Sequence, residues 1–333
     1  MRACFPLTNM LNRTTLVSSY FFVWSLSTVP NAARGKKPAD AALRSLLSDV
    51  RHGPRFGLRD GLLALGYREN TQFTLGVRFT QANVAVLPAA ARQLVDDGVD
   101  LIFASDVVSA KVAQMATTQI PIVFAGVGDL LGLGLIQSFA RPGGIMTGVI
   151  HLDTGLGANR LKIFRDTVPG LKRILFAYNQ ADDSAVQAAT TYREATRLGI
   201  VLVEQPVHTQ EEAQTMVAQA QRDAVDGLLK PPGTSLNTLG FILAATSQQI
   251  ISGMFDAAFW VERGGLASYG PNYDDSGRLA ARLVDNILIG AKPAQIPVAM
   301  NAKIKLVINL QVAKALGLTI APEVRYVADR LIR

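Results

Sequence analysis

The chain of 333 residues is long enough for two lobes with separate hydrophobic cores. Apolar residues make up 49% and charged residues 18%, which excludes a disordered chain. The formal net charge is +7, yet Lys and Arg are scattered among Asp and Glu, so the sequence predicts a solvated basic surface and no nucleic-acid partner. The single cysteine, Cys4, excludes an internal disulfide.

The N-terminus has the order of a secretory signal. Arg2 and Arg13 precede an apolar run at residues 16–29, and two small residues follow at 32–33. The run is shorter than the roughly 20 residues that span a bilayer. We therefore expect residues 1–33 to be a cleaved signal peptide and the mature protein to be periplasmic; an uncleaved anchor or a wrongly assigned start codon is the alternative.

From about residue 41, short apolar strands alternate with longer helical segments, which predicts βαβ crossovers and parallel sheets. The first array begins with a strand and alternates through Leu43 to Ser48, Arg55 to Leu65, Phe73 to Phe79, Val84 to Asp96, Val99 to Ala104, Val107 to Thr117 and Ile122 to Ala125. A second array begins with a helix and alternates through Gly157 to Val168, Arg173 to Ala177, Ala185 to Leu198, Ile200 to Glu204, Glu211 to Arg222 and Val225 to Leu229.

Arg141 to Gly144 interrupt the rhythm between the two arrays. We therefore expect an α/β fold with two lobes. Lobe 1 covers 41–148, with a C-terminal return at about 267–292, and lobe 2 covers 149–266. The assignment of 293–333 stays open.

Motifs for catalysis or cofactor binding are absent from the sequence. His52, His151 and His208 have no metal-binding spacing, and neither a nucleophile elbow nor a phosphate loop occurs. Glycines 126, 128 and 132 come close to a dinucleotide fingerprint, but the last glycine is one residue late. We expect no catalytic residue, no metal and no cofactor.

Short polar residues follow the predicted strands, at the edge of a parallel sheet where ligands bind. The candidate ligand-binding residues found in this way are Ser48, Asp106, Ser109, Asp129, Asn179 and Ser235. Such residues also cap helices, so for each one a capping role is the alternative. Asp106 or Asp129 would suit a ligand ammonium group.

Three long stretches, Ile120 to Val149, Gly264 to Val298 and Lys305 to Ile320, resemble the ABC-transporter substrate-binding proteins of the tryptophan/tyrosine type. The resemblance implies a type I periplasmic-binding fold, with two doubly wound parallel-sheet lobes, a multi-strand hinge and a ligand in the cleft between the lobes. It adds Tyr269 to the ligand-binding residues. The chain departs from the family at Asp129-Leu130, at Asn179-Gln180 and over 230–237, where specificity is set.

The resulting hypothesis is an extracytoplasmic solute-binding protein, a monomer without enzymatic activity, that delivers a small molecule to a membrane ABC permease. The ligand would be an amino acid or an aromatic or carboxylate compound, with Tyr269, Phe255 and Trp260 as stacking candidates and lobe packing as their alternative role. Three other functions stay open: a sensory binding protein for a receptor kinase, a cytoplasmic regulator, and a small-molecule α/β enzyme.

Overall fold

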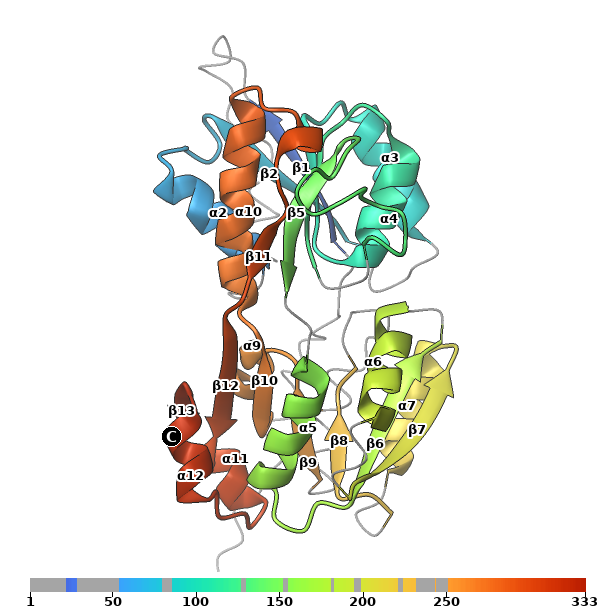
Figure 1. Ribbon diagram of the computed structural model, residues 1–333, viewed down its shortest axis with the longest axis vertical. Helices are drawn as coiled ribbons and strands as arrows, with labels where there is room; N and C mark the ends of the chain where they lie inside the picture. The colour runs from blue at the N-terminus through green and yellow to red at the C-terminus, as the bar shows by residue number, and fades with distance from the viewer. Residues whose placement is uncertain are drawn as a thin grey trace, which may run out of the picture.

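The computed structural model describes residues 22–28, 54–79, 86–126, 130–151, 155–180, 183–194, 199–220, 224–231, 243 and 251–333. They form two lobes along the long axis of the molecule, each a β-sheet with helices packed on it (Figure 1). The predicted α/β class with parallel sheets is confirmed. In the part of the chain that the structure describes, no helix has the length and apolar character that a membrane crossing requires.

Sheet A forms the first lobe, with the strand order β11-β5-β4-β3-β1-β2. Strands β3, β4, β5 and β11 are parallel, whereas β1 is antiparallel to both of its neighbours. The elements of this lobe are β1 Phe22–Thr28, α2 Pro54–Ala64, β2 Phe73–Phe79, α3 Leu87–Asp96, β3 Leu101–Ala104, α4 Val107–Ala116, β4 Ile122–Ala125, β5 Met146–His151, α10 Tyr273–Leu288, the 3-10 helix η5 Pro293–Gln295 and β11 Ala299–Asn301.

Alternate residues of the buried strands of sheet A face opposite helix layers. In β3, Leu101 and Phe103 join the core of α2 and α10, whereas Ile102 and Ala104 join the core of α3 and α4. Figure 1 shows α2 beside α10, away from α3 and α4. Half of the first lobe's core therefore depends on α10, a helix from the C-terminal part of the chain.

Sheet B forms the second lobe, with the strand order β13-β12-β10-β9-β8-β6-β7. All neighbouring strands are parallel except β10 and β12. The elements of this lobe are α5 Leu156–Thr167, β6 Arg173–Asn179, α6 Asp183–Glu194, β7 Val201–Val207, α7 Gln210–Gln219, β8 Gly227–Leu229, β9 Ser252–Phe255, α9 Ala258–Glu262, β10 Ala267–Pro271, β12 Ile304–Asn309, α11 Leu310–Ala315, α12 Pro322–Val327 and β13 Arg330–Ile332.

Two features of the N-terminal and C-terminal segments differ from the sequence-based expectation. Strand β1 lies within the apolar run that we predict to be an export signal, and the predicted first strand, Leu43 to Ser48, lies outside the described residues. The chain also returns to the first lobe only from Asn272, because β10 belongs to sheet B and not to the predicted return at about 267–292. Residues 293–333, which the sequence left unassigned, are divided between the lobes: β11 joins sheet A, and β12 and β13 join sheet B.

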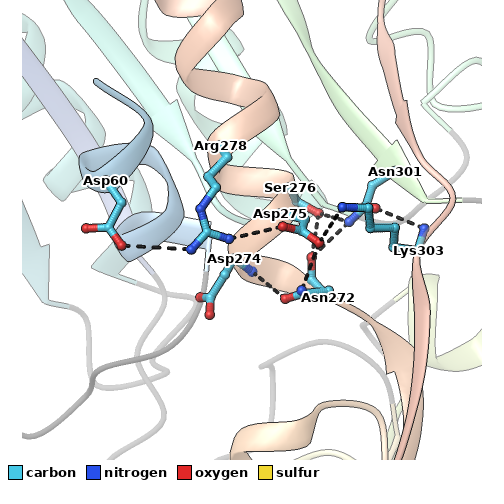
Figure 2. A network of polar contacts seen from close by, with 8 residues as sticks. All are labelled: Asp60, Asn272, Asp274, Asp275, Ser276, Arg278, Asn301 and Lys303. Carbon is cyan, nitrogen blue, oxygen red and sulfur yellow. Dashed lines mark hydrogen bonds and ion pairs between the residues drawn. The ribbon is translucent and has the colours of Figure 1, made fainter. Parts of the chain in front are cut away.

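Three connections link the lobes within the described part of the chain: β5 to α5, β10 to α10 and β11 to β12. Two of them are bonded directly to each other (Figure 2). The main-chain N–H of Asn272 donates to the carbonyl oxygen of Lys303 at 3.0 Å. The buried amide of Asn301 donates to the main-chain oxygen of Asn272 and to the hydroxyl of Ser276, both at 2.8 Å. We refer to Asn272, Ser276, Asn301 and Lys303 as the hinge network.

A set of charged side chains extends the hinge network toward solvent (Figure 2). The Asp275 carboxylate lies 3.0 Å from Arg278 and 3.3 Å from the ammonium of Lys303, and Arg278 reaches Asp60 on α2 at 4.0 Å. Half or more of the Arg278 and Lys303 side chains is exposed, so water screens these pairs. The buried Asn301 amide is therefore the stronger connection at the hinge.

We predict that Gly57→Ala destabilises the first lobe. A Cβ at this position in α2 would collide with the main-chain oxygen of Asp274, at the start of α10, and main chain cannot rotate away. The overpacking cost of about 1–3 kcal/mol outweighs the gain of up to about 1 kcal/mol in helix propensity. Urea unfolding measures the change. Leu63→Ala, at an exposed position of the same helix, is the control, and equal stabilities of Gly57→Ala and wild type would contradict the close approach of α2 and α10.

Candidate ligand-binding site

The carboxyl ends of β3, β4 and β5 of sheet A and of β6, β8, β9 and β10 of sheet B lie at the boundary between the lobes. Strand β5 leads from sheet A into lobe 2, and β3 and β4 are parallel to it. Strand β10 leads from sheet B into lobe 1, and β6, β8 and β9 are parallel to it. Figure 1 shows β5 pointing toward the second lobe. A ligand held between the lobes would meet both of these sheet edges.

On the side of the first lobe, Asp106 and Ser109 form a helix cap. The Asp106 carboxylate accepts hydrogen bonds from the main-chain N–H of Ser109 at 2.7 Å and from its hydroxyl at 2.9 Å, at the start of α4. Gly126, directly after β4, packs on the same turn, since a Cβ there would lie 3.0 Å from the Cα of Asp106. The capping alternative is thus realised, and ligand binding by these two residues stays a prediction.

On the side of the second lobe, Asn179 is the last residue of β6 and is buried. The Tyr269 main-chain oxygen accepts a hydrogen bond from Arg160 at 2.7 Å, and the Tyr269 side chain packs, partly buried, against the core under α5. Phe255 and Trp260 are buried in the core under α7 and α9, so these two aromatic residues have the packing role. The predicted site residues Ser48, Asp129 and Ser235 lie outside the described residues.

The structure reveals a buried ion pair that the sequence-based search missed. Lys230 directly follows β8, and Asp256 directly follows β9. The Lys230 ammonium lies 3.1 Å from Oδ2 of Asp256, and the two side chains are only 5% and 7% exposed. The same ammonium donates to the carbonyl oxygen of Pro231 at 2.7 Å. Burying a charged side chain costs free energy unless the charge is paired. The presence of two such charges at the strand ends therefore indicates a functional role.

A second buried cation, Arg160 of α5, lies close to the ion pair. Its guanidinium donates to the Tyr269 main-chain oxygen and to the Tyr192 hydroxyl, both at 2.7 Å. Burial alone would lower the pKa of Arg160, but the electrostatic effects of Tyr192, Asp256 and Tyr273 and the bond to Tyr192 raise it overall. The site therefore combines two buried cations with one carboxylate, and this excess positive charge favours a ligand that carries an anionic group.

His151, the last residue of β5, lies buried where the connections between the lobes meet. It pairs in register with Asn301 of β11, and its ring packs edge-on against Tyr273 at 5.4 Å between ring centroids. Neither ring nitrogen has a hydrogen-bond partner among the described residues. Burial lowers the pKa of His151 to about 4, which keeps the imidazole neutral near pH 7.

The signals for these residues in the sequence were weak. Lys230 opens the segment 230–237, which departs from the family, but Asp256 is surrounded by apolar residues and carries no motif. In the described part of the chain, no group of three or more His, Cys, Asp or Glu side chains is placed to hold a metal ion. The described polar groups suit the recognition of a small organic molecule.

Two parallel-sheet lobes, three connections and polar strand ends at the lobe boundary define a two-lobed binding protein of the periplasmic type. The chain belongs to the family described as ABC transporter substrate binding protein, whose model matches residues 45–332. Accordingly, it is a substrate-binding protein of an ABC transporter and takes a small molecule as ligand.

Relatives support this assignment over most of the chain. A tyrosine-binding protein from Clostridioides difficile is 25% identical over 258 residues, which cover 76% of this chain and 73% of that protein. An ABC domain from Streptococcus pneumonia, solved in complex with L-Trp, is 25% identical with a TM-score of 0.73, and the match covers 84% of this chain and 95% of that one. A conserved domain protein from Vibrio cholerae is 28% identical with a TM-score of 0.76, and the match covers 84% and 94% of the two chains.

We predict that His151 makes the protein less stable in acid. The pKa is 6.5 in an ordinary environment and about 4 in the fold, so the unfolded chain binds a proton first as the pH falls. The free energy of unfolding is therefore highest above pH 6.5 and decreases as the pH falls to about 4, by roughly 3 kcal/mol in total. His151→Phe keeps a buried ring but cannot titrate.

Urea unfolding at pH 7 and pH 4.5 tests this effect. Between the two pH values, the stability of the wild type relative to His151→Phe should decrease by about 2 kcal/mol. If the difference in unfolding free energy between wild type and His151→Phe were the same at both pH values, a buried neutral imidazole would be contradicted.

Proposed function

We propose that this chain is the extracytoplasmic component of an ABC importer and closes its two lobes on an aromatic amino acid or a related aromatic carboxylate. The observation that carries the proposal is the buried set of Lys230, Asp256 and Arg160 at the carboxyl ends of the sheet B strands. Two cations and one carboxylate match a ligand with an anionic group and a hydrogen-bond donor. The tyrosine-binding and L-Trp-bound relatives support an aromatic ligand.

Binding without turnover is part of this proposal. The relatives are described by what they bind. Rotation of the lobes about the hinge network would bury the ligand and present a closed surface to a membrane permease. Burying an aromatic ring of about 150–250 Å² would contribute roughly 4–6 kcal/mol, and the buried charges would set the orientation of the ligand. We further propose that the protein acts as a monomer.

A thermal-shift screen of amino acids, aromatic acids and small carboxylates tests the ligand class. We expect L-tyrosine, L-tryptophan or a close analogue to raise the melting temperature, because a ligand at 100 times its Kd stabilises a protein by about 2.7 kcal/mol. Asn179→Ala and Asp129→Ala should weaken binding about tenfold or more through a lost hydrogen bond to the ligand. Asn159→Ala, at an exposed position of α5, is the control. Failure of all compounds to bind would contradict the ligand class.

The predicted export signal has a test of its own. We propose that the protein is exported and loses residues 1–33, so the intact mass of protein recovered outside the cytoplasm should correspond to a chain without them. Sheet A would then lack β1. An exported protein whose mass still includes Phe22–Thr28 would contradict cleavage.

A further inference from the structure

The two oxygens of the Asp256 carboxylate have different surroundings. Oδ2 lies 3.1 Å from the Lys230 ammonium and accepts a hydrogen bond from the Tyr273 hydroxyl at 3.5 Å. Oδ1 is buried and has no hydrogen-bond partner among the described residues. About nine in ten buried polar groups in proteins are hydrogen-bonded, so an open carboxylate oxygen is unusual.

The open oxygen is held in a fixed position. Lys230 fixes the carboxylate on one side and is itself held by the Pro231 carbonyl. On the other side, β9 and β10 are parallel neighbours, and Gly270 lies so close that a Cβ there would collide with the Asp256 main-chain oxygen. The acceptor is therefore placed before any ligand arrives, which is how binding sites obtain specificity.

Two other buried polar side chains lack a hydrogen-bond partner among the described residues. Within the described residues these are His151, whose ring contacts Tyr273, and Ser268, which is paired in register with Phe255, the residue before Asp256. Ser268 shares the strand face of Phe255, opposite to that of Asp256, whereas His151 and Asp256 both contact Tyr273. A bound molecule with a hydrogen-bond donor would satisfy the open oxygen of Asp256.

We infer that Asp256 is a specificity-determining residue, whose Oδ1 accepts a hydrogen bond from an ammonium or hydroxyl group of the ligand. This inference rests on the proposed function, which supplies the ligand, and it adds a requirement: the ligand must bring a donor next to its anionic group. Tyr273 contacts Asp256 Oδ2 and the ring of His151, so it lies between this recognition point and the hinge network.

Isothermal titration calorimetry with matched compounds tests the requirement. L-tyrosine and L-tryptophan carry an ammonium group, whereas 3-(4-hydroxyphenyl)propionate and indole-3-propionate have the same rings and carboxylates without it. Wild-type protein should bind the amino acid of a pair at least 100-fold more tightly than its analogue. This comparison needs no variant, so it holds even if a substitution of Asp256 prevents folding.

Asp256→Asn assigns the preference to this residue. The amide oxygen can still accept a hydrogen bond from Lys230. The amide NH2 then takes the place of Oδ1, so a hydrogen-bond donor faces the ammonium or hydroxyl donor of the ligand. We expect the preference to fall to tenfold or less. Asp166→Asn is the matched control, because it changes an acid of α5 that is paired with Lys162, and it should keep the preference.

Equal affinities of wild type for both members of a pair, or an unchanged preference in Asp256→Asn, would overturn the inference and leave the proposed function standing. If none of the four compounds binds wild-type protein, the proposed ligand class fails, and the donor requirement fails with it.

Discussion

The hydrogen bonds of the Asn301 amide hold the molecule together at the point where the two lobes are joined. They tie the connection between β11 and β12 to the start of α10. Because α10 forms half of the first lobe's core with α2, this one buried amide links the packing of lobe 1 to the strands of lobe 2. The positions of His151 and Tyr273 beside it follow from the same joint.

The candidate site depends on a second constraint, the cost of buried charge. Lys230 and Asp256 are stable inside the protein only as a pair, and Arg160 only through its bonds to Tyr192 and Tyr269. Several strands therefore have to be in register before these groups can meet. The site therefore exists only after sheet B has formed, and the second lobe should fold before the protein can bind its ligand.

Much of the fold could be predicted because strand and helix patterns are local. Alternation predicted β2 and an apolar run predicted β4, both with their correct bounds. The order of the elements from α2 to β4 and from α5 to β8 also agrees with the two predicted arrays. The start of the C-terminal return was placed too early, because β10 is followed at once by the hinge and no loop separates them. The Lys230–Asp256 pair could not be predicted, because it joins residues 26 positions apart through the pairing of β8 with β9. Of the predicted site residues, Ser109, Asn179 and Tyr269 lie in helices or strands of the described fold, and Asp106 caps α4.

The glycines of α2 have a consequence for how the molecule could move. Gly57 faces the main chain of Asp274, and a Cβ at Gly61 would lie 2.5 Å from that of Ala281, so α2 and α10 touch with no space for a methyl group. Helices in such contact cannot slide past each other. Any bending at Asn272 would therefore rotate α2 and α10 together as one rigid unit. A rotation of a few degrees at the hinge would move the far end of α10 by a larger distance than the end next to the hinge.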